Sequence, residues 1–296
     1  MQTSMECIPC FVRQAEEAVA LSTKDSALRE TMLRQILHAL ADADWANCPP
    51  AIAQHLHRII RKETGESDPY RSVKDRMNGL ALEALPSCRK LIATAADPRE
   101  AVVRVAVAGN LLDSGAKIQI QPENLPNLLA TLWDKPLAGD PQELFRRAER
   151  AERILYLADN AGEIIFDRLL LNFLPMEKVT LAVRGCPILN DALRGDAEIA
   201  GFNGLVPIIE NGSDAPGTVL SDCSQEFRDA FDHADLIISK GQGNYETLSA
   251  VRAPIFFLFT VKCPIVAEQI GEPTGTMVAK KSPLWADSHR ADPELM

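Results

Sequence analysis

The chain has 296 residues, of which 46% are hydrophobic and 24% charged, so it is long enough for two domains and too apolar for extensive disorder. Its formal net charge of −10 argues against a general nucleic-acid-binding surface, which requires a net basic face, although a local basic pocket stays compatible with it. No apolar run approaches the roughly 20 residues that span a membrane, and the first residues lack the basic-then-apolar pattern of a signal peptide. We therefore expect a cytoplasmic protein that binds neither nucleic acid nor membrane.

The cysteines do not form the pattern of a disulfide framework. Their number is odd and only the first two are close together: Cys7, Cys10, Cys48, Cys88, Cys186, Cys223 and Cys263. This usage indicates a reducing compartment.

The first half of the chain, to about residue 150, is predicted to be helical. Apolar residues recur at helical spacing in five segments, which are residues 11–21, 27–43, 51–62, 77–95 and 98–112. Proline-containing breakers separate several of them. Residues 119–140 contain three prolines and are predicted to lead into a further helix over residues 141–152.

From residue 153 the pattern changes to short apolar or β-branched runs, each followed by a turn and a helical stretch. The expected strands are residues 154–158, 179–183, 205–209, 236–239 and 255–261. Such alternation predicts a mainly parallel sheet, in which the turns after the strands gather at one edge and bind ligands. We thus expect an α/β protein with a mainly helical domain at residues 1–150, an α/β domain at residues 151–296, and a frayed tail from residue 280.

Two of these turns carry adjacent amide and carboxylate side chains. Asp159 and Asn160 follow the first strand, and Asp191 ends the turn after the second. Capping of the helices that follow, including one over residues 192–200, is a simpler explanation for each aspartate alone. Because both lie at one sheet edge, we favour a site in which Asp159, Asn160 and Asp191 bind a hard divalent cation. No cysteine or histidine lies beside them, which disfavours zinc.

The turns after the fourth and fifth strands are basic. Residues 239–246 form a glycine-rich turn that enters a helix, where Lys240 supplies charge and backbone N–H groups can approach an anion. A lone Gly-x-Gly is weak evidence for a phosphate site, because an ordinary tight turn can have the same residues. Lys262 puts a second lysine at the same edge. The expected site therefore has acids for a metal opposite lysines for a phosphate.

Four motifs in these turns together resemble the DUF89 family of metal-dependent damage-control phosphatases, which includes the acidic-residue-methyltransferase-like proteins. They are Asp-Asn-Ala-Gly-Glu from Asp159 to Glu163, Arg-Gly-x-Pro-Ile-Leu-Asn-Asp from Arg184 to Asp191, Lys-Gly-x-Gly-Asn-Tyr-Glu from Lys240 to Glu246, and Lys-Cys-Pro from Lys262. The resemblance extends to Cys7-x-x-Cys10, to Asp68-Pro-Tyr-x-x-x-Lys74 with Asn78, and to Gly109-Asn110-x-x-Asp113. The Cys-x-x-Cys pair is typical of the prokaryotic branch of the family.

The resemblance implies a helical domain beside a Rossmann-like αβα domain, and hydrolysis of phosphomonoesters with Mn²⁺, Ni²⁺, Co²⁺ or Mg²⁺. It assigns Asp159, Asn160 and Asp191 as metal ligands. It implies a substrate-phosphate region made of Lys240, Gly241, Gln242, Gly243, Asn244 and Lys262, with Glu163 and Arg184 as supporting or substrate contacts. The expected partner is a small phosphorylated metabolite, such as a sugar phosphate or a damaged nucleotide, and the oligomeric state is open.

The reaction that these residues favour is attack of water on a phosphate, while Lys240, Lys262 and the backbone of residues 241–244 neutralise the charge that develops. An aspartyl-phosphate route, as in haloacid-dehalogenase-type phosphatases, needs a second aspartate two residues after the first. Ala161 occupies that position, which disfavours this route without excluding Asp159 as a nucleophile.

Two other functions stay open. An S-adenosylmethionine-dependent carboxyl methyltransferase would use a similar sheet, but such enzymes, like NAD-binding ones, place a glycine-rich turn after the first strand. The turn here is Asp-Asn-Ala-Gly-Glu, which favours a metal over a nucleoside cofactor. A non-catalytic metal- or nucleotide-binding protein would bind its ligand without turnover.

The remaining signals are weaker. Cys7 and Cys10 lack a second pair that would complete a zinc site, so packing at a helix start is favoured over half a zinc site or a redox pair. The resemblance implies a further alternative, a pair needed for phosphatase function. His55 and His57 are interpreted as surface histidines, and residues 58–62 as a solvated basic helix face. Three further residues are site candidates through the resemblance alone: Lys74, Asn78 and Asn110.

Overall fold

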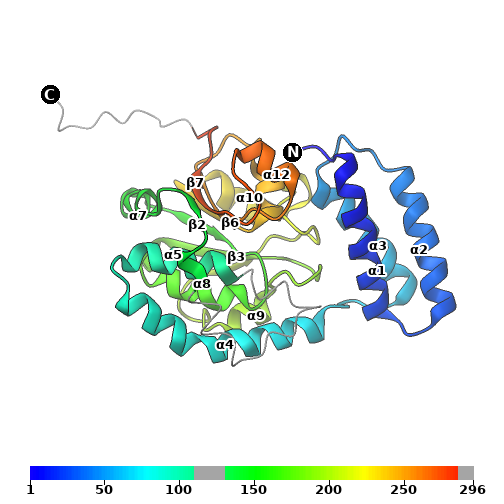
Figure 1. Cartoon of the computed structure of the whole chain (residues 1–296), viewed down its shortest axis with the longest axis horizontal. Helices are drawn as coiled ribbons and strands as arrows, with labels where there is room; N and C mark the ends of the chain where they lie inside the picture. Colours follow the sequence, from blue (N-terminus) through cyan, green and yellow to red (C-terminus); the bar gives the residue numbers. More distant parts are fainter. Residues whose placement is uncertain (110–130, 286–296) are drawn as a thin grey trace.

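A computed structural model describes residues 1–109 and 131–285 (Figure 1). In this part of the chain, seven strands form one sheet in the order β1-β7-β6-β5-β2-β3-β4. The strands are β1 (Leu137–Gly139), β2 (Ile154–Leu157), β3 (Val179–Val183), β4 (Ile208–Glu210), β5 (Leu236–Lys240), β6 (Ile255–Thr260) and β7 (Met277–Lys281). Strands β4, β3, β2, β5 and β6 are parallel, whereas β7 is antiparallel to β6 and pairs in parallel with β1. Strand β3 lies on one side of β2 and β5 on the other, so the strand order reverses at β2. Open α/β sheets bind ligands at the carboxyl ends of the strands beside such a reversal.

Helices cover both faces of the sheet, because alternate side chains of a strand point to opposite faces. Ile154 and Tyr156 of β2 pack into one apolar core, and Leu155 and Leu157 into another. The first core is closed by α4 (Arg71–Thr94), α5 (Pro98–Ala108), α7 (Pro141–Arg150), α8 (Glu163–Leu171) and α9 (Arg194–Ile199). The second is closed by α10 (Gln225–Asp232), α11 (Gln242–Leu248) and α12 (Pro264–Ile270). The result is a three-layer αβα sandwich.

A helical bundle precedes the sandwich. Its helices α1 (Ile8–Ser22), α2 (Ser26–Ala41) and α3 (Pro49–Thr64) share a core of their own. Asp25 caps α2 by accepting hydrogen bonds from the N–H groups of Ala27 and Leu28 at 2.9 and 3.3 Å, and Gly65, with φ of 72°, ends α3. From the bundle, α4 runs along the sandwich (Figure 1). Within the described residues, no helix combines the length and the apolar character that crossing a membrane requires.

The predicted α/β class with a mainly parallel sheet is confirmed. The third predicted strand, residues 205–209, begins only at Ile208, and both β1 and β7 are missing from the prediction. The expected fraying from residue 280 is wrong for residues 280–285, because Lys280 and Lys281 complete β7 and pair with β6. The rest of the tail and residues 110–112 of a predicted helix lie outside the described residues.

The predicted domain boundary at residue 150 does not coincide with a packing boundary. Strand β1 and helix α7 come before residue 150, yet β1 pairs with β7 and α7 packs in the same core as β2. Helices α4 and α5 also belong to the sandwich. The physical reason is that the periodicity of a helix shows which face is apolar but not which neighbour that face packs against.

Candidate active site

The loops after β2 and β3 bring the three predicted metal ligands together. Asp159 and Asn160 follow β2 directly, and the Asn160 backbone forms an isolated antiparallel bridge with that of Asp191. The Ala192 N–H donates to the Asp159 carbonyl at 2.8 Å and extends this contact. The exposed fractions are 8% for Asp159, 5% for Asn160 and 3% for Asp191. Backbone pairing thus assembles two carboxylates and one carboxamide at the carboxyl edge of the sheet.

Two carboxylates hold the side chain of Asn160. Its NH₂ group donates to Asp159 Oδ2 at 2.7 Å and to Glu163 Oε2 at 3.1 Å. Because the nitrogen is committed in this way, the carboxamide oxygen is the atom through which Asn160 would bind a cation. Glu163 is the first residue of α8 and is fully buried, so here it supports a ligand and offers no exposed surface to a substrate.

The turn between β2 and α8 is anchored on α4. Gly162 has φ of 74°, a conformation that glycine tolerates, and its N–H donates to Asn78 Oδ1 at 2.7 Å. The Asn78 NH₂ group donates to Asp196 Oδ1 of α9 at 2.7 Å. Asn78, a candidate through the resemblance alone, therefore acts as a scaffold for the turn that carries Asp159. Asp196 belongs to none of the motifs, so sequence reasoning missed it.

Arg184 follows β3 and bridges the two ligand carboxylates. Its Nε donates to Asp191 Oδ2 at 2.6 Å, and its Nη2 lies 3.8 Å from Asp159 Oδ1. The same Nη2 donates to Asn244 Oδ1 at 3.2 Å, which also accepts a hydrogen bond from the Thr218 hydroxyl at 2.8 Å. Only 2% of Arg184 is exposed. Its main effect at the site is to neutralise part of the charge of the two carboxylates.

The glycines of the turn after β5 are required by close packing. Gly241 has φ of 81°, and a Cβ built on it would lie 2.0 Å from Asp159 Oδ2. A Cβ on Gly243 would lie 2.2 Å from the Pro216 carbonyl oxygen in the loop after β4. The turn that we expected to approach a phosphate therefore contacts a ligand side chain and a neighbouring loop.

Lys240 is the last residue of β5, and its side chain points toward α5 and α8. Its Nζ donates to Glu163 Oε1 and to Asp167 Oδ1 at 2.6 Å each, and to the Ala106 carbonyl at 2.9 Å. The side chain has no exposed surface. The prediction that Lys240 presents its ammonium group to a phosphate is therefore wrong in this structure. Lys240 lies on the same strand face as Ile238, which packs against those helices.

Lys262 is exposed and lies at the predicted sheet edge, directly after β6. Its backbone N–H donates to Gln242 Oε1 at 2.8 Å, so the glycine-rich turn holds the segment that carries Lys262. The Gln242 NH₂ group donates to Glu246 Oε1 at 2.8 Å, which fixes the Gln242 side chain in turn. Of the two lysines predicted to contact a phosphate, Lys262 is the one on the open side of the sheet edge.

The electrostatics at Asp159 favour binding of a cation. Burial, together with the negative charge of Glu163, raises the pKa of the Asp159 carboxyl to about 7. The positive charges of Arg184, Lys262 and Lys240 oppose this shift. A divalent cation next to the carboxylate would offset the cost of burying its negative charge.

The donor atoms at the site fit a hard cation. Among the described residues, no group of three or more His, Cys, Asp and Glu side chains could hold a metal ion. A metal here would therefore use the mixed set of Asp159, Asn160 and Asp191. Carboxylate and carboxamide oxygens suit Mg²⁺, Mn²⁺ and similar ions, whereas zinc sites use nitrogen and sulfur more often.

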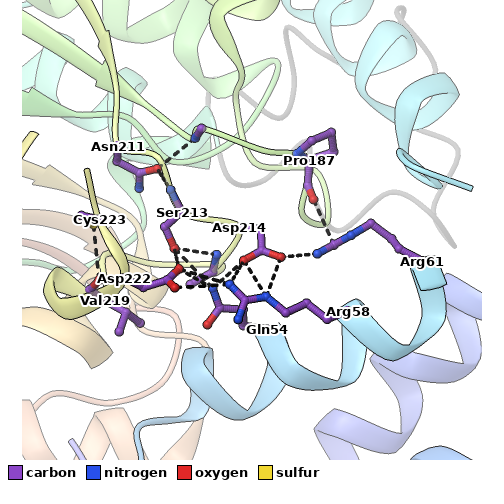
Figure 2. Close-up of polar contacts among 12 residues, drawn as sticks. Gln54, Arg58, Arg61, Pro187, Asn211, Ser213, Asp214, Val219, Asp222 and Cys223 are labelled. Atoms are coloured by element: carbon purple, nitrogen blue, oxygen red, sulfur yellow. Dashed lines mark hydrogen bonds and ion pairs between the residues drawn. The ribbon is translucent and has the colours of Figure 1, made fainter. Parts of the chain in front are cut away.

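Polar residues of α3 tie the bundle to the loop after β4 (Figure 2). Arg58 Nη2 donates to Asp214 Oδ1 at 2.5 Å, Arg61 forms an ion pair with the same carboxylate, and Gln54 donates to Asp222 Oδ2 at 2.7 Å. Burial alone would raise the pKa of Asp214, but hydrogen bonds from Arg58 and Gln54 and the charges of both arginines lower it. The interpretation of this basic helix face as solvated is wrong for Arg61, whose side chain is 18% exposed.

The same loop reaches the active site. Asn211 Oδ1 accepts hydrogen bonds from the N–H groups of Gly185 and Ser213 at 2.9 and 3.0 Å (Figure 2). The Ser213 hydroxyl donates to Asp222 Oδ2 at 2.6 Å. Because Gly185 follows Arg184, hydrogen bonds connect α3 to the arginine that bridges the ligands. Sequence reasoning missed the acidic residues of this loop, since isolated acids in a loop have no diagnostic spacing.

Cys7 and Cys10 lie at the start of α1 and are free thiols, as are the other cysteines. Cys10 is exposed, whereas Cys7 is half-buried with its Sγ 3.6 Å from the Ser4 hydroxyl. This geometry places the pair on the bundle, and a functional role for it stays a prediction.

Two further residues named from the sequence, His57 and Lys74, are buried in the bundle and in α4. His57 is 3% exposed and its Nε2 has no hydrogen-bond partner among the described residues, so the surface interpretation is wrong for this histidine. Lys74 is 1% exposed, and its Nζ lies 2.7 Å from Asp68 Oδ2. Asn110 and Asp113 lie outside the described residues.

Comparisons with known proteins agree on one family. A family-level sequence profile, described as the damage-control phosphatase ARMT1-like domain, matches residues 3–278. A damage-control phosphatase of Pyrococcus horikoshii is 34% identical over 288 residues, which cover 95% of this chain and 99% of that protein. A damage-control phosphatase of Archaeoglobus fulgidus is 34% identical over 287 residues, with the same 95% and 99% coverage.

A solved structure agrees with these sequence matches. The crystal structure of a DUF89 family protein from Pyrococcus horikoshii superposes with a TM-score of 0.86 at 31% identity, covering 95% of this chain and 99% of that one. The family and the phosphatase class predicted from the sequence are thereby confirmed. With matches over nearly its whole length in sequence and in structure, the chain belongs to the DUF89 family of damage-control phosphatases with an ARMT1-like domain.

Proposed function

We propose that this phosphatase hydrolyses small phosphomonoesters with a divalent cation held by Asp159, Asn160 and Asp191. The proposal is carried by the backbone bridge between Asn160 and Asp191, which assembles three oxygen-donor side chains beside the central strand of the sheet. Mn²⁺, Ni²⁺, Co²⁺ and Mg²⁺ are the candidate ions. When bound, such an ion polarises a phosphate oxygen and lowers the pKa of a water molecule.

The protein's own residues orient the reacting groups. Lys262 lies exposed at the same edge, where its ammonium group can contact phosphate oxygens and neutralise charge in the transition state. Arg184 Nε donates to the Asp191 carboxylate at 2.6 Å and orients it. Asn160 is held by Asp159 and Glu163, which accept hydrogen bonds from its nitrogen and leave its oxygen as the atom that would bind the cation.

Water is the proposed nucleophile. Both oxygens of Asp159 have neighbours, since Oδ2 accepts from Asn160 at 2.7 Å and Oδ1 lies 3.8 Å from Arg184 Nη2. A carboxylate held on both sides suits a metal ligand better than an attacking group. Trapping of a phosphorylated Asp159 would contradict this part of the proposal.

The proposed substrates are damaged or surplus sugar phosphates and nucleotide-related metabolites. The names of the relatives from Pyrococcus horikoshii and Archaeoglobus fulgidus support a phosphatase that acts in damage control. The free state of the cysteines supports a reducing compartment, and we propose the cytoplasm. The net charge of −10 supports small-molecule substrates over nucleic acid.

Release of inorganic phosphate from a panel of phosphomonoesters tests the proposal, first with metal-stripped protein and then with each cation. We expect the cation to restore activity, and Asp159→Asn to lower it by about 10²-fold or more. Asp232→Asn, at an exposed aspartate that ends α10, is the matched control and should keep full activity. Cation binding without phosphate release would indicate a non-catalytic binding protein, and methyl transfer from S-adenosylmethionine would indicate the methyltransferase.

A further inference from the structure

Behind the ligand carboxylates lies an ion cluster that the proposed hydrolysis does not use. It consists of Lys240, Glu163 and Asp167, with Lys240 Nζ 2.6 Å from an oxygen of each acid. None of the three side chains has any exposed surface. Two carboxylates buried around one ammonium group add little to the stability of the fold, because the cost of removing the charges from water offsets most of their attraction. A role in positioning explains their presence better.

The cluster is connected to a metal ligand through Glu163. Glu163 Oε1 accepts from Lys240, and its other oxygen, Oε2, accepts from the NH₂ group of Asn160 at 3.1 Å. The same NH₂ group donates to Asp159 Oδ2 at 2.7 Å. A carboxamide can rotate so that its oxygen and nitrogen exchange places, and only the oxygen can bind a cation. Glu163 and Asp159 therefore together select the orientation of Asn160 that binds metal.

Lys240 is fully engaged in this cluster. Its three ammonium hydrogens match three acceptors, which are Glu163 Oε1, Asp167 Oδ1 and the Ala106 carbonyl at 2.9 Å. The residue after α5 also makes room for the acid, since a Cβ on Gly109 would lie 2.7 Å from Glu163 Cγ. Turning Lys240 toward a phosphate would leave two buried carboxylates without their cation, which is strongly unfavourable.

We propose that Asp167 and Lys240 are positioning residues, which hold Glu163 so that Asn160 keeps its carboxamide oxygen directed at the metal. This inference rests on the proposed metal site and gives Lys240 a role other than contact with a phosphate. Outer contacts of this kind affect the affinity of metal sites by about 10- to 100-fold.

Replacing Glu163 with glutamine gives a sharp test, because the two side chains have the same shape. The Lys240 ammonium group requires an oxygen at the Oε1 position, so the glutamine NH₂ group must face the NH₂ group of Asn160. The Asn160 NH₂ group then keeps only Asp159 Oδ2 as an acceptor, so the orientation that directs the carboxamide oxygen at the cation loses one of its two supports. We expect Glu163→Gln to weaken Mn²⁺ binding by the full-length protein about tenfold or more, measured by electron paramagnetic resonance of free Mn²⁺.

The double variant Lys240→Met with Glu163→Gln adds a second test. It loses one positive and one negative charge, so the cluster keeps its net charge. Without the ammonium group, the glutamine can turn its oxygen toward Asn160 and restore the orientation that binds metal. We expect the double variant to regain most of the Mn²⁺ affinity that Glu163→Gln loses, with KM at saturating Mn²⁺ close to that of the wild type.

Glu177→Gln, at an exposed glutamate of the short 3-10 helix Met176–Lys178, is the matched control and should bind Mn²⁺ like the wild type. Unchanged Mn²⁺ affinity in Glu163→Gln would overturn the positioning role. A rise in KM alone in the double variant would make Lys240 a phosphate contact after all. A wild-type protein that neither binds Mn²⁺ nor releases phosphate would instead overturn the proposed function, so the two failures are distinct. Circular dichroism of each variant verifies the fold.

Discussion

His57 shows how one buried side chain makes the bundle sensitive to acid. Burial, together with the positive charge of Arg61, lowers its pKa to about 3, and the negative charge of Asp214 opposes this shift. In the unfolded chain, where a histidine has a pKa of about 6.5, this side chain binds a proton as the pH falls through 6.5. In the folded protein it stays neutral until the pH approaches 3. The stability that depends on neutral His57 is present above pH 6.5 and is lost as the pH falls toward 3.

We expect His57→Leu to reduce the acid sensitivity of folding. Between pH 7 and pH 5 the wild type should lose about 2 kcal/mol of unfolding free energy through this histidine, and the variant should not. Urea unfolding at both pH values measures the difference. His55→Leu, two residues away on the exposed side of α3, is the control and should lose as much as the wild type. Equal losses in both variants would show that His57 is not the source.

Lys240 shows what sequence reasoning can and cannot give for a single residue. The pattern places it at the end of a strand, and the period of two puts it on the same face as Ile238. Which helices cover that face depends on the path of α5 and α8, which the pattern leaves open. Asp159, Asn160 and Asp191 were predictable because they follow strands that pair directly, and backbone pairing alone brings them together.

At the scale of elements, α3 is joined to the loop after β4 by ion pairs. Arg58 and Arg61 share the Asp214 carboxylate, which is 11% exposed (Figure 2). Contacts between residues this far apart leave no pattern in the local sequence. The apolar periodicity of α3 and the β-branched run of β3, in contrast, are local patterns that predict a helix and a strand. The existence of most helices and strands was therefore predictable, and the attachment of the bundle was not.

Asp214→Asn should loosen this attachment. The change removes the negative charge shared by two arginines, and we expect the free energy of unfolding to fall by about 1–3 kcal/mol, because Arg58 is half exposed and Arg61 mostly buried. Glu30→Gln removes the exposed pair with Arg34 on α2 and should cost less than about 0.5 kcal/mol. Urea unfolding compares the two. Similar effects would mean that the Asp214 pairs contribute no more than surface pairs.

At the scale of the whole molecule, a cation at the site should stabilise the entire sandwich. Its ligands follow β2 and β3 in the middle of the sheet, so they are in place only when the sheet is formed. At a concentration 100 times the Kd, binding adds about 2.7 kcal/mol, which raises Tm by about 5 °C for a chain of this size. Thermal unfolding with and without Mn²⁺ measures this. A rise in Tm of the same size in Asp159→Asn would show that the ion binds at another site.

The separate core of α1, α2 and α3 has a consequence for how the molecule fluctuates. A unit with its own core can open while the central strands stay paired, so amide protons in the bundle should exchange with solvent faster than those of β2 and β5. Asp159 is held by the strand and by its bridge to the loop after β3, not by the bundle. A molecule whose bundle has opened would therefore keep its three proposed metal ligands assembled and lose only the support of the loop beside them.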